Sequence, residues 1–285
     1  MTDLPVPTVE TGWLAANLGA SGLIVVDGSW RMPGAGFARE DYERRHIPGA
    51  VFFDIDEIAD KSTKLPHMLP SPDEFDRAMS DLGIGSHARI VVYDDAGLFS
   101  AARVWWTFRV MGHEAVSVLN GGLPKWIAEK RPVEAGAVKR HASTFRSKFR
   151  ADRVCSADDV RASLVTGDAV ILDARPAGRF EGRDPEPRPG LRCGHMPGAA
   201  SLPHGELVAD GALKPADELE RIFSARGVSG HKPVVATCGS GVSAAVLALA
   251  LERLGRARHA VYDGSWTEWG DSNNDPARFP VATGA

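Results

Sequence analysis

The segment Val234–Leu254 reads Val-Val-Ala-Thr-Cys-Gly-Ser-Gly-Val-Ser-Ala-Ala-Val-Leu-Ala-Leu-Ala-Leu-Glu-Arg-Leu. Its first four residues are mostly apolar or β-branched, which predicts a short buried strand. From Ser243 onward the residues favour a helix, and Gly255 follows at a position that typically ends one. A strand, a tight glycine loop and a helix in this order predict an α/β fold with a parallel sheet flanked by helices.

The chain carries a second copy of this pattern. Because four matched pairs in one order are hardly a coincidence, we predict a duplicated α/β domain, and the unit is too long for a solenoid repeat. The predicted domains are residues 1–130 and 156–285, with a linker over residues 131–155. The matched pairs are Val25–Ser29 with Ile171–Arg175, His46–Ala50 with His195–Ala199, Ile90–Asp94 with Val234–Cys238, and Asn120–Trp126 with Asp263–Trp269.

The composition of the 285 residues is that of an ordinary globular protein, with 44% hydrophobic residues and a net charge of −4. Disorder is excluded, and a nucleic-acid partner is not expected because the basic excess is missing. The basic segment 131–155 is better explained as a solvated connector. No apolar run reaches the ~18 residues of a membrane span, and the first residues do not resemble a secretory signal. We therefore expect a cytoplasmic protein with no membrane partner.

Three cysteines, Cys155, Cys193 and Cys238, form no CxxC pair. A disulfide framework and a cysteine-based zinc site are therefore not expected, and nothing implies a metal or organic cofactor. Cys238 differs from the other two because the first copy has Asp94 at the matching position. Both positions follow a predicted strand, and ligands of open α/β sheets bind at the carboxyl ends of strands.

The loop after Cys238 has the composition of an anion cradle. Two glycines in four residues let the backbone curl with its N–H groups inward, and a helix N-terminus follows. A cysteine there should be stabilised as thiolate, the nucleophilic form. The predicted cradle consists of Gly239, Ser240, Gly241, Val242 and Ser243. A cysteine phosphatase would need an arginine that closes the loop, but none follows before Arg253.

These residues resemble the two-domain sulfurtransferases of the rhodanese superfamily over residues 10–275. The resemblance implies two tandem rhodanese-like domains, an inactive N-terminal copy and a catalytic C-terminal copy. The motifs that carry it are His46–Asp56, His67–Pro70, Ser100–Trp106, Asp184–Arg188, Cys238–Val242 and Tyr262–Trp269.

Within the superfamily, Gly239-Ser240 is similar to the loop of members that use 3-mercaptopyruvate, whereas thiosulfate-using members have a basic pair there. The resemblance implies that Cys238 takes the donor sulfur as a persulfide and releases pyruvate. A thiol such as thioredoxin or glutathione, or cyanide, would then accept the sulfur. Arg179 and Arg188 are implied to bind the substrate carboxylate and keto oxygens. Alternatively, they belong to a surface loop and pair with its acidic residues.

For the proton transfer, the resemblance implies a relay of Ser240 and His46 with an acid of the first domain, for which Glu40 and Asp41 are candidates. The alternative for His46 is a structural role, because both copies have a histidine before Pro-Gly. Asp94 is interpreted as a vestige of a lost cysteine, with an acid at the domain interface as the alternative.

Two other functions stay open. One is a thiosulfate:cyanide sulfurtransferase on the same fold, and the other is a non-catalytic rhodanese-like relay or binding module. Cys155 and Cys193 are expected to be unreactive, although an exposed Cys193 could form a regulatory disulfide. A monomer is expected because the duplication supplies an interface within one chain.

Overall fold

The computed structural model describes residues 4–32, 34–230 and 232–284 and divides the chain into two compact units. The first unit holds the chain up to Lys61, Leu69–Arg150 and Val208–Leu213. The second holds Ser62–Met68, Ala151–Leu207 and the chain from Lys214 onward. A short segment from each half of the sequence thus packs in the unit that the other half mainly forms.

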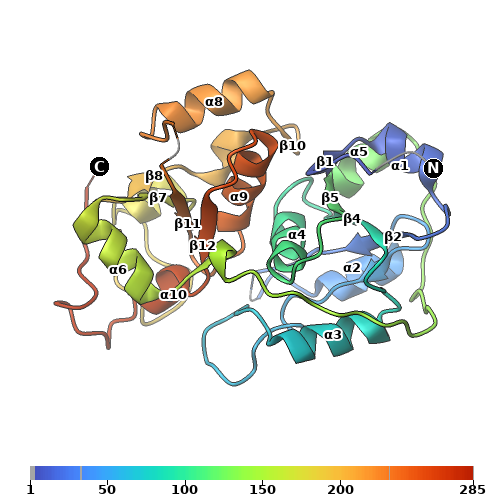
Figure 1. Cartoon of the computed structure of the whole chain (residues 1–285), viewed down its shortest axis with the longest axis horizontal. Helices are drawn as coiled ribbons and strands as arrows, with labels where there is room; N and C mark the ends of the chain where they lie inside the picture. Colours follow the sequence, from blue (N-terminus) through green and yellow to red (C-terminus); the bar gives the residue numbers. More distant parts are fainter. Residues whose placement is uncertain (1–3, 33, 231, 285) are drawn as a thin grey trace. The chain divides into compact units, whose positions relative to one another are not determined.

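In the first unit, five parallel strands form a sheet in the order β1-β5-β4-β2-β3. The three central strands are buried almost throughout, because helices cover both faces of the sheet (Figure 1). The strands are β1 (Thr8–Val9), β2 (Leu23–Asp27), β3 (Val51–Phe52), β4 (Arg89–Tyr93) and β5 (Val116–Leu119), and the helices are α1 (Thr11–Asn17), α2 (Ala38–Arg44), α3 (Pro72–Asp81), α4 (Ser100–Val110) and α5 (Gly122–Ala128).

The second unit repeats this order as β6-β12-β11-β7-β8, again with parallel strands. The predicted α/β fold of two tandem domains is therefore confirmed. The strands are β6 (Val154–Cys155), β7 (Val170–Asp173), β8 (Ala200–Ser201), β11 (Val234–Thr237) and β12 (His259–Tyr262). The helices are α6 (Ala157–Thr166), α7 (Ala177–Phe180), α8 (Ala216–Ser224), α9 (Ala244–Arg253) and α10 (Ser265–Trp269), with short 3₁₀ turns at Ala151–Arg153 and His204–Leu207.

The duplication extends to the cores. In the first unit α1 and α5 place Leu14 and Trp126 against the same sheet face. In the second unit α6 and α10 place Val160 and Trp269 at the corresponding positions. Both α3 and α6 begin with a capping box, in which a serine and an acidic residue three positions later satisfy each other's backbone N–H groups.

Residues 131–150 of the predicted linker belong to the first unit. The N–H groups of Lys148 and Arg150 donate to Met111 and Val110 carbonyls over 2.8 and 2.7 Å, and the Phe145 ring is buried against Phe75. The segment looks like a connector in sequence because it has few apolar residues. Its ordering comes instead from backbone hydrogen bonds and one inserted aromatic ring.

The two short segments that pack in the unit of the other half of the sequence differ in what they contribute. Residues 208–213 form a hairpin of β9 (Val208–Ala209) and β10 (Ala212–Leu213), and the Leu213 N–H donates to Asn120 Oδ1 over 2.9 Å within the first unit. Residues 62–68 bring His67 into the second unit. Neither placement follows from local sequence pattern, because both depend on long-range contacts.

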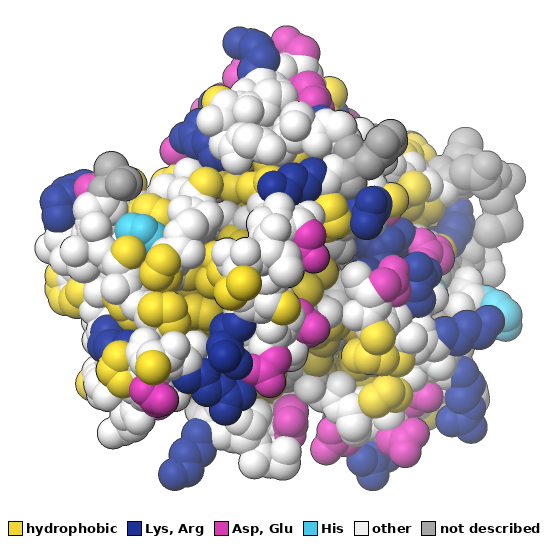
Figure 2. Space-filling view, turned by 60° about the vertical axis from the view of Figure 1, so that its left-hand side comes forward, with side chains coloured by type: hydrophobic (Ala, Val, Ile, Leu, Met, Phe, Trp, Pro, Cys, Tyr) yellow, Lys and Arg dark blue, Asp and Glu magenta, His cyan; other side chains and the backbone are white. Residues whose placement is uncertain are grey.

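Basic and acidic side chains are interspersed on the face that Figure 2 shows, in keeping with the small net charge. Among the residues that the structure describes, no helix has the length and apolar character that crossing a membrane would require.

Candidate active site

Cys238 follows directly on β11 and lies six residues before α9. It is 2% exposed, and Gly241 takes the left-handed backbone conformation, with φ +77°, that the tight turn needs. The Cys238 and Gly239 carbonyls accept from the Trp266 and Thr267 N–H groups of α10, both over 2.9 Å. These two hydrogen bonds fix the backbone of the loop. Among the described residues, the Ser240 N–H has no acceptor.

The matching loop of the first unit shows what such a backbone binds. Asp94 follows β4 and also lies six residues before its helix. Its fully buried carboxylate accepts from the N–H groups of Ala96, Phe99 and Ala101, over 3.0, 2.8 and 2.8 Å. Burial raises the pKa of Asp94, and these N–H groups oppose the rise. The loop is thus an anion site that its own side chain occupies, which fits the interpretation of Asp94 as a vestige.

Ser265 holds the cysteine backbone in place, a role that sequence reasoning missed. Its hydroxyl donates to the Tyr262 carbonyl over 2.8 Å and accepts from the Cys238 N–H over 3.2 Å. Ser265 has φ +49°, and its counterpart Gly122 has φ +53°. A serine in the left-handed region carries backbone strain, which is typical of functional sites. The signal in the sequence was a serine where the first copy has glycine.

Arg179, on α7, lies beside the cysteine loop. A side chain at Gly239 would start 3.1 Å from Arg179 Nη2, so the glycine makes room for the guanidinium. Arg179 donates from Nε to Glu186 Oε1 over 3.2 Å, and its Nη2 contacts Glu186 Oε2. The side chain of Arg179 is 19% exposed and that of Glu186 is 2% exposed. The pairing with an acidic neighbour therefore exists, but it is a partly buried pair beside Gly239 and not a solvated surface pair.

Glu186 connects two arginines, a role that sequence reasoning also missed. It accepts from Arg175 Nη1 over 2.8 Å as well as from Arg179. Arg175 is fully buried, donates to Asp173 and to the Gly194 carbonyl, and lies 4.1 Å from the centre of the Trp266 ring. This network fixes Arg179 from behind.

Arg188 connects the loop to the segment that carries His67. Its Nη1 donates to Ser240 Oγ over 3.5 Å, and its Nη2 lies 3.2 Å from His67 Nε2. His67 is 6% exposed. The motif His67–Pro70 carries part of the resemblance, but the sequence alone assigns no chemical role to His67. The second unit therefore places the predicted residues Ser240, Arg179 and Arg188 around the Cys238 loop, with His67 beside Arg188.

His46 lies in the first unit, where it is fully buried. Its Nδ1 lies 2.8 Å from the Tyr42 carbonyl, and its Nε2 lies 3.2 Å from Glu134 Oε1. His195, its counterpart, makes a similar contact from Nδ1 to the Phe180 carbonyl over 2.8 Å. Both ring nitrogens of His46 thus have partners in its own unit, which favours the structural alternative. Of the two candidate acid partners, Asp41 pairs instead with Arg31 and Arg44.

The other two cysteines lie away from any glycine cradle. Burial, with a contribution from Asp159, raises the pKa of the Cys155 thiol to about 11, so it is protonated near neutral pH. Cys193 is exposed and has no disulfide partner among the described residues.

Known proteins match the chain over nearly its whole length. The 3-mercaptopyruvate sulfurtransferase of Escherichia coli K12 is 45% identical over 264 residues, which cover 92% of this chain and 94% of that protein. The thiosulfate sulfurtransferase of Bos taurus is 41% identical over 269 residues, covering 92% and 91%. The crystal structure of SseA from Escherichia coli superposes with a TM-score of 0.84 at 42% identity, covering 93% of this chain and 99% of SseA.

The family model described as the Rhodanese-like domain matches residues 10–129 and 156–272, once in each half of the chain. With this double match and the identities above, the chain belongs to the rhodanese family.

Proposed function

We propose that the protein is a sulfurtransferase that moves the sulfur of 3-mercaptopyruvate, through a persulfide on Cys238, to a thiol or cyanide and releases pyruvate. One observation carries the proposal. Cys238 lies at the mouth of a loop whose twin in the first unit holds a carboxylate with three backbone N–H groups. The name of the Escherichia coli relative supports the choice of donor.

In the proposed reaction the Cys238 thiolate attacks the thiol sulfur of the donor. A bond forms between the two sulfur atoms while the carbon–sulfur bond breaks, and its electron pair stays on carbon as the enolate of pyruvate. A proton then converts the enolate to pyruvate. The outer sulfur of the persulfide lies in the N–H cradle until an acceptor thiolate attacks it and regenerates Cys238. Thioredoxin and glutathione are suitable acceptors because each presents a thiol.

The charge at the site suits a donor with one carboxylate. Arg175 and Arg179 pair with Asp173 and Glu186, so these four charges cancel, and Arg188 beside Ser240 adds one positive charge. Arg175 is saturated by its partners, whereas Arg179 and Arg188 flank the cysteine loop. We assign these two guanidinium groups to the donor carboxylate and keto oxygens, since guanidinium geometry matches a carboxylate.

For the protonation of the enolate, we propose that Ser240 acts with Arg188 and His67, and that His46 takes no part. An arginine can only donate, so Arg188 Nη2 donates to His67 Nε2, which must then be unprotonated. Arg188 also donates to Ser240 Oγ, so the Ser240 hydroxyl keeps its own proton and can pass it to the enolate. Ser240 then regains the proton that the acceptor thiol loses when it attacks the persulfide as a thiolate. His67→Gln should change the pH profile of turnover, whereas His46→Gln should affect mainly stability. If only His46→Gln changed the pH profile, the relay of Ser240 and His46 would be favoured instead.

The second candidate is a thiosulfate:cyanide sulfurtransferase, which the name of the 41% identical bovine relative favours. Against it stands the Gly239-Ser240 pair, which adds no positive charge beside Cys238 for a dianion.

The test is steady-state turnover of 3-mercaptopyruvate and of thiosulfate with one thiol acceptor, in wild type and Cys238→Ser. The proposal expects preference for 3-mercaptopyruvate by at least about 30-fold and loss of activity in the variant, since one misplaced charge is worth about 2–5 kcal/mol. Mass spectrometry after donor treatment should show one added sulfur on Cys238. Preference for thiosulfate would favour the second candidate, and absence of the added sulfur would favour a non-catalytic module.

A further inference from the structure

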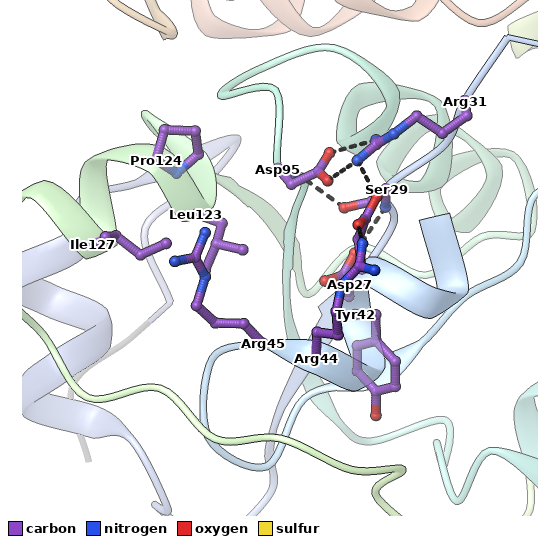
Figure 3. A pocket seen from close by; sticks show the side chains of 11 residues that line it. Asp27, Ser29, Arg31, Tyr42, Arg44, Arg45, Asp95, Leu123, Pro124 and Ile127 are labelled. Carbon is purple, nitrogen blue, oxygen red and sulfur yellow. Dashed lines mark hydrogen bonds and ion pairs between the residues drawn. The ribbon is translucent and has the colours of Figure 1, made fainter. Parts of the chain in front are cut away.

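The first unit contains a cavity of about 720 Å³ at the carboxyl ends of β2 and β4. Its walls come from the segment after β2, from α2 and from α5 (Figure 3). The place corresponds to that of the cysteine loop in the second unit, since β4 and β11 hold matching positions in the two sheets. The volume lies within the range of sites for small molecules.

The sulfur chemistry of this place is blocked by the chain itself. Asp94 occupies the N–H cradle, as described above. Arg31 follows β2 in the first unit, as Arg179 follows β7 in the second. It donates from Nη1 to Asp95 Oδ1 over 2.8 Å and from Nη2 to Asp41 Oδ2 over 2.8 Å. Arg44 pairs with Asp41 as well. A sulfur anion therefore finds neither a cradle nor an open guanidinium at these positions.

Arg45 is the remaining cation of the cavity wall. Among the described residues its guanidinium has no hydrogen bond or ion pair, although Arg31 and Arg44 beside it are paired. The side chain extends away from the Arg31–Asp95 pair, toward Leu123 and Ile127 (Figure 3). These two residues and Pro124 give this side of the cavity an apolar strip on α5.

We propose that this cavity binds a small organic carboxylate, whose carboxylate group pairs with Arg45 and whose apolar body packs on the strip of Leu123, Pro124 and Ile127. A guanidinium binds a carboxylate with two parallel hydrogen bonds, and the strip removes the apolar body from water. The site does not depend on Cys238 or on sulfur transfer. It gives the first unit, which lacks the cysteine, a binding function of its own.

Phenylacetate is a suitable probe, and phenylacetamide is its neutral isostere. Isothermal titration of the full chain should show saturable binding of phenylacetate and at least about tenfold weaker binding of phenylacetamide, because the isostere cannot form the charged pair. Arg45→Gln should weaken phenylacetate binding at least about tenfold. The matched control Arg39→Gln, on the same helix but outside the cavity wall, should leave it unchanged.

Arg188→Gln removes a proposed carboxylate ligand of the second unit and separates the two sites. Binding that persists in Arg188→Gln and is lost in Arg45→Gln supports the proposal. The reverse pattern would place the probe at the cysteine loop and overturn it, as would the absence of saturable binding. Ile127→Glu, on the partly exposed strip, should also weaken binding by placing a second carboxylate there, and unchanged binding in this variant would contradict the assigned pose.

Discussion

The two halves of the chain share one fold but treat the same loop differently. In the first unit a carboxylate at position 94 receives three backbone N–H groups and fills the loop from inside. In the second unit Cys238 stands at the matching position, and its loop leaves the Ser240 N–H without a protein acceptor among the described residues. The comparison teaches that the anion site is a property of the fold, while the residue at its mouth decides whether it is occupied or reactive.

A second difference lies at the end of the neighbouring strand. Asp173 receives a buried arginine, Arg175, which in turn binds Glu186 and so reaches Arg179. In the first unit Asp27 has Ser29 at the matching place, and burial raises the pKa of Asp27 to about 6. The buried arginine behind the loop is therefore a feature of the second unit, whereas Ser29 adds no charge at the matching place of the first unit.

Cys238→Asp would make the second loop a copy of the first. The new carboxylate should accept the loop N–H groups and preserve the fold, while sulfur transfer falls by about 10,000-fold or more, as for loss of a nucleophile. Turnover and the unfolding temperature measure the two effects. A variant that loses stability as well as activity would show that the two loops are not equivalent.

Asp94→Ala would empty the first loop. Three N–H groups, of which that of Ala101 is buried, would lose their acceptor, so the free energy of unfolding should fall by at least about 2 kcal/mol. Urea unfolding measures this, with the first transition taken separately if the two units unfold in steps. Asp94→Asn keeps one acceptor oxygen and should lose less. Equal stability of Asp94→Ala and wild type would contradict the anion-site interpretation.

Asp27→Asn would test how the buried Asp27 carboxyl, which among the described residues has no arginine partner like Arg175, makes stability depend on pH. A raised folded-state pKa means that the stabilisation by the protonated form is present below the ordinary value of 3.8 and is lost as the pH rises through about 6. The free energy of unfolding of wild type minus that of the variant should therefore fall by about 2 kcal/mol between pH 4 and 7. A difference that stays constant with pH would contradict the assignment.

Glu186→Gln would remove one negative charge from the network behind Arg179. The site would gain one net positive charge, so the kcat/KM ratio of thiosulfate to 3-mercaptopyruvate should rise about tenfold. Glu181→Gln, in the same segment but paired with Arg183, should leave the ratio unchanged. An equal loss for both donors would mean that Glu186 only positions Arg179.

The sequence alone was enough for the duplicated parallel sheets and for the candidate loop, because both depend on local patterns. Apolar runs predict buried strands, paired glycines predict a tight turn, and the repeat links Asp94 to Cys238. The α/β fold follows from these features and the structure confirms it. Arg179 and Arg188 could be proposed only because a family motif carries them.

Tertiary structure decided which residues far apart in the sequence meet. His67 joins Arg188 across 121 positions, and the hairpin at 208–213 returns to Asn120 of the first unit. No periodic pattern in the sequence predicts such contacts, because they depend on where a whole segment packs. One contact of His46 is also of this kind, since its hydrogen bond to Glu134 joins residues 88 positions apart. Local pattern thus determined the fold and the cysteine loop, and long-range packing determined which charged and histidine side chains lie around that loop.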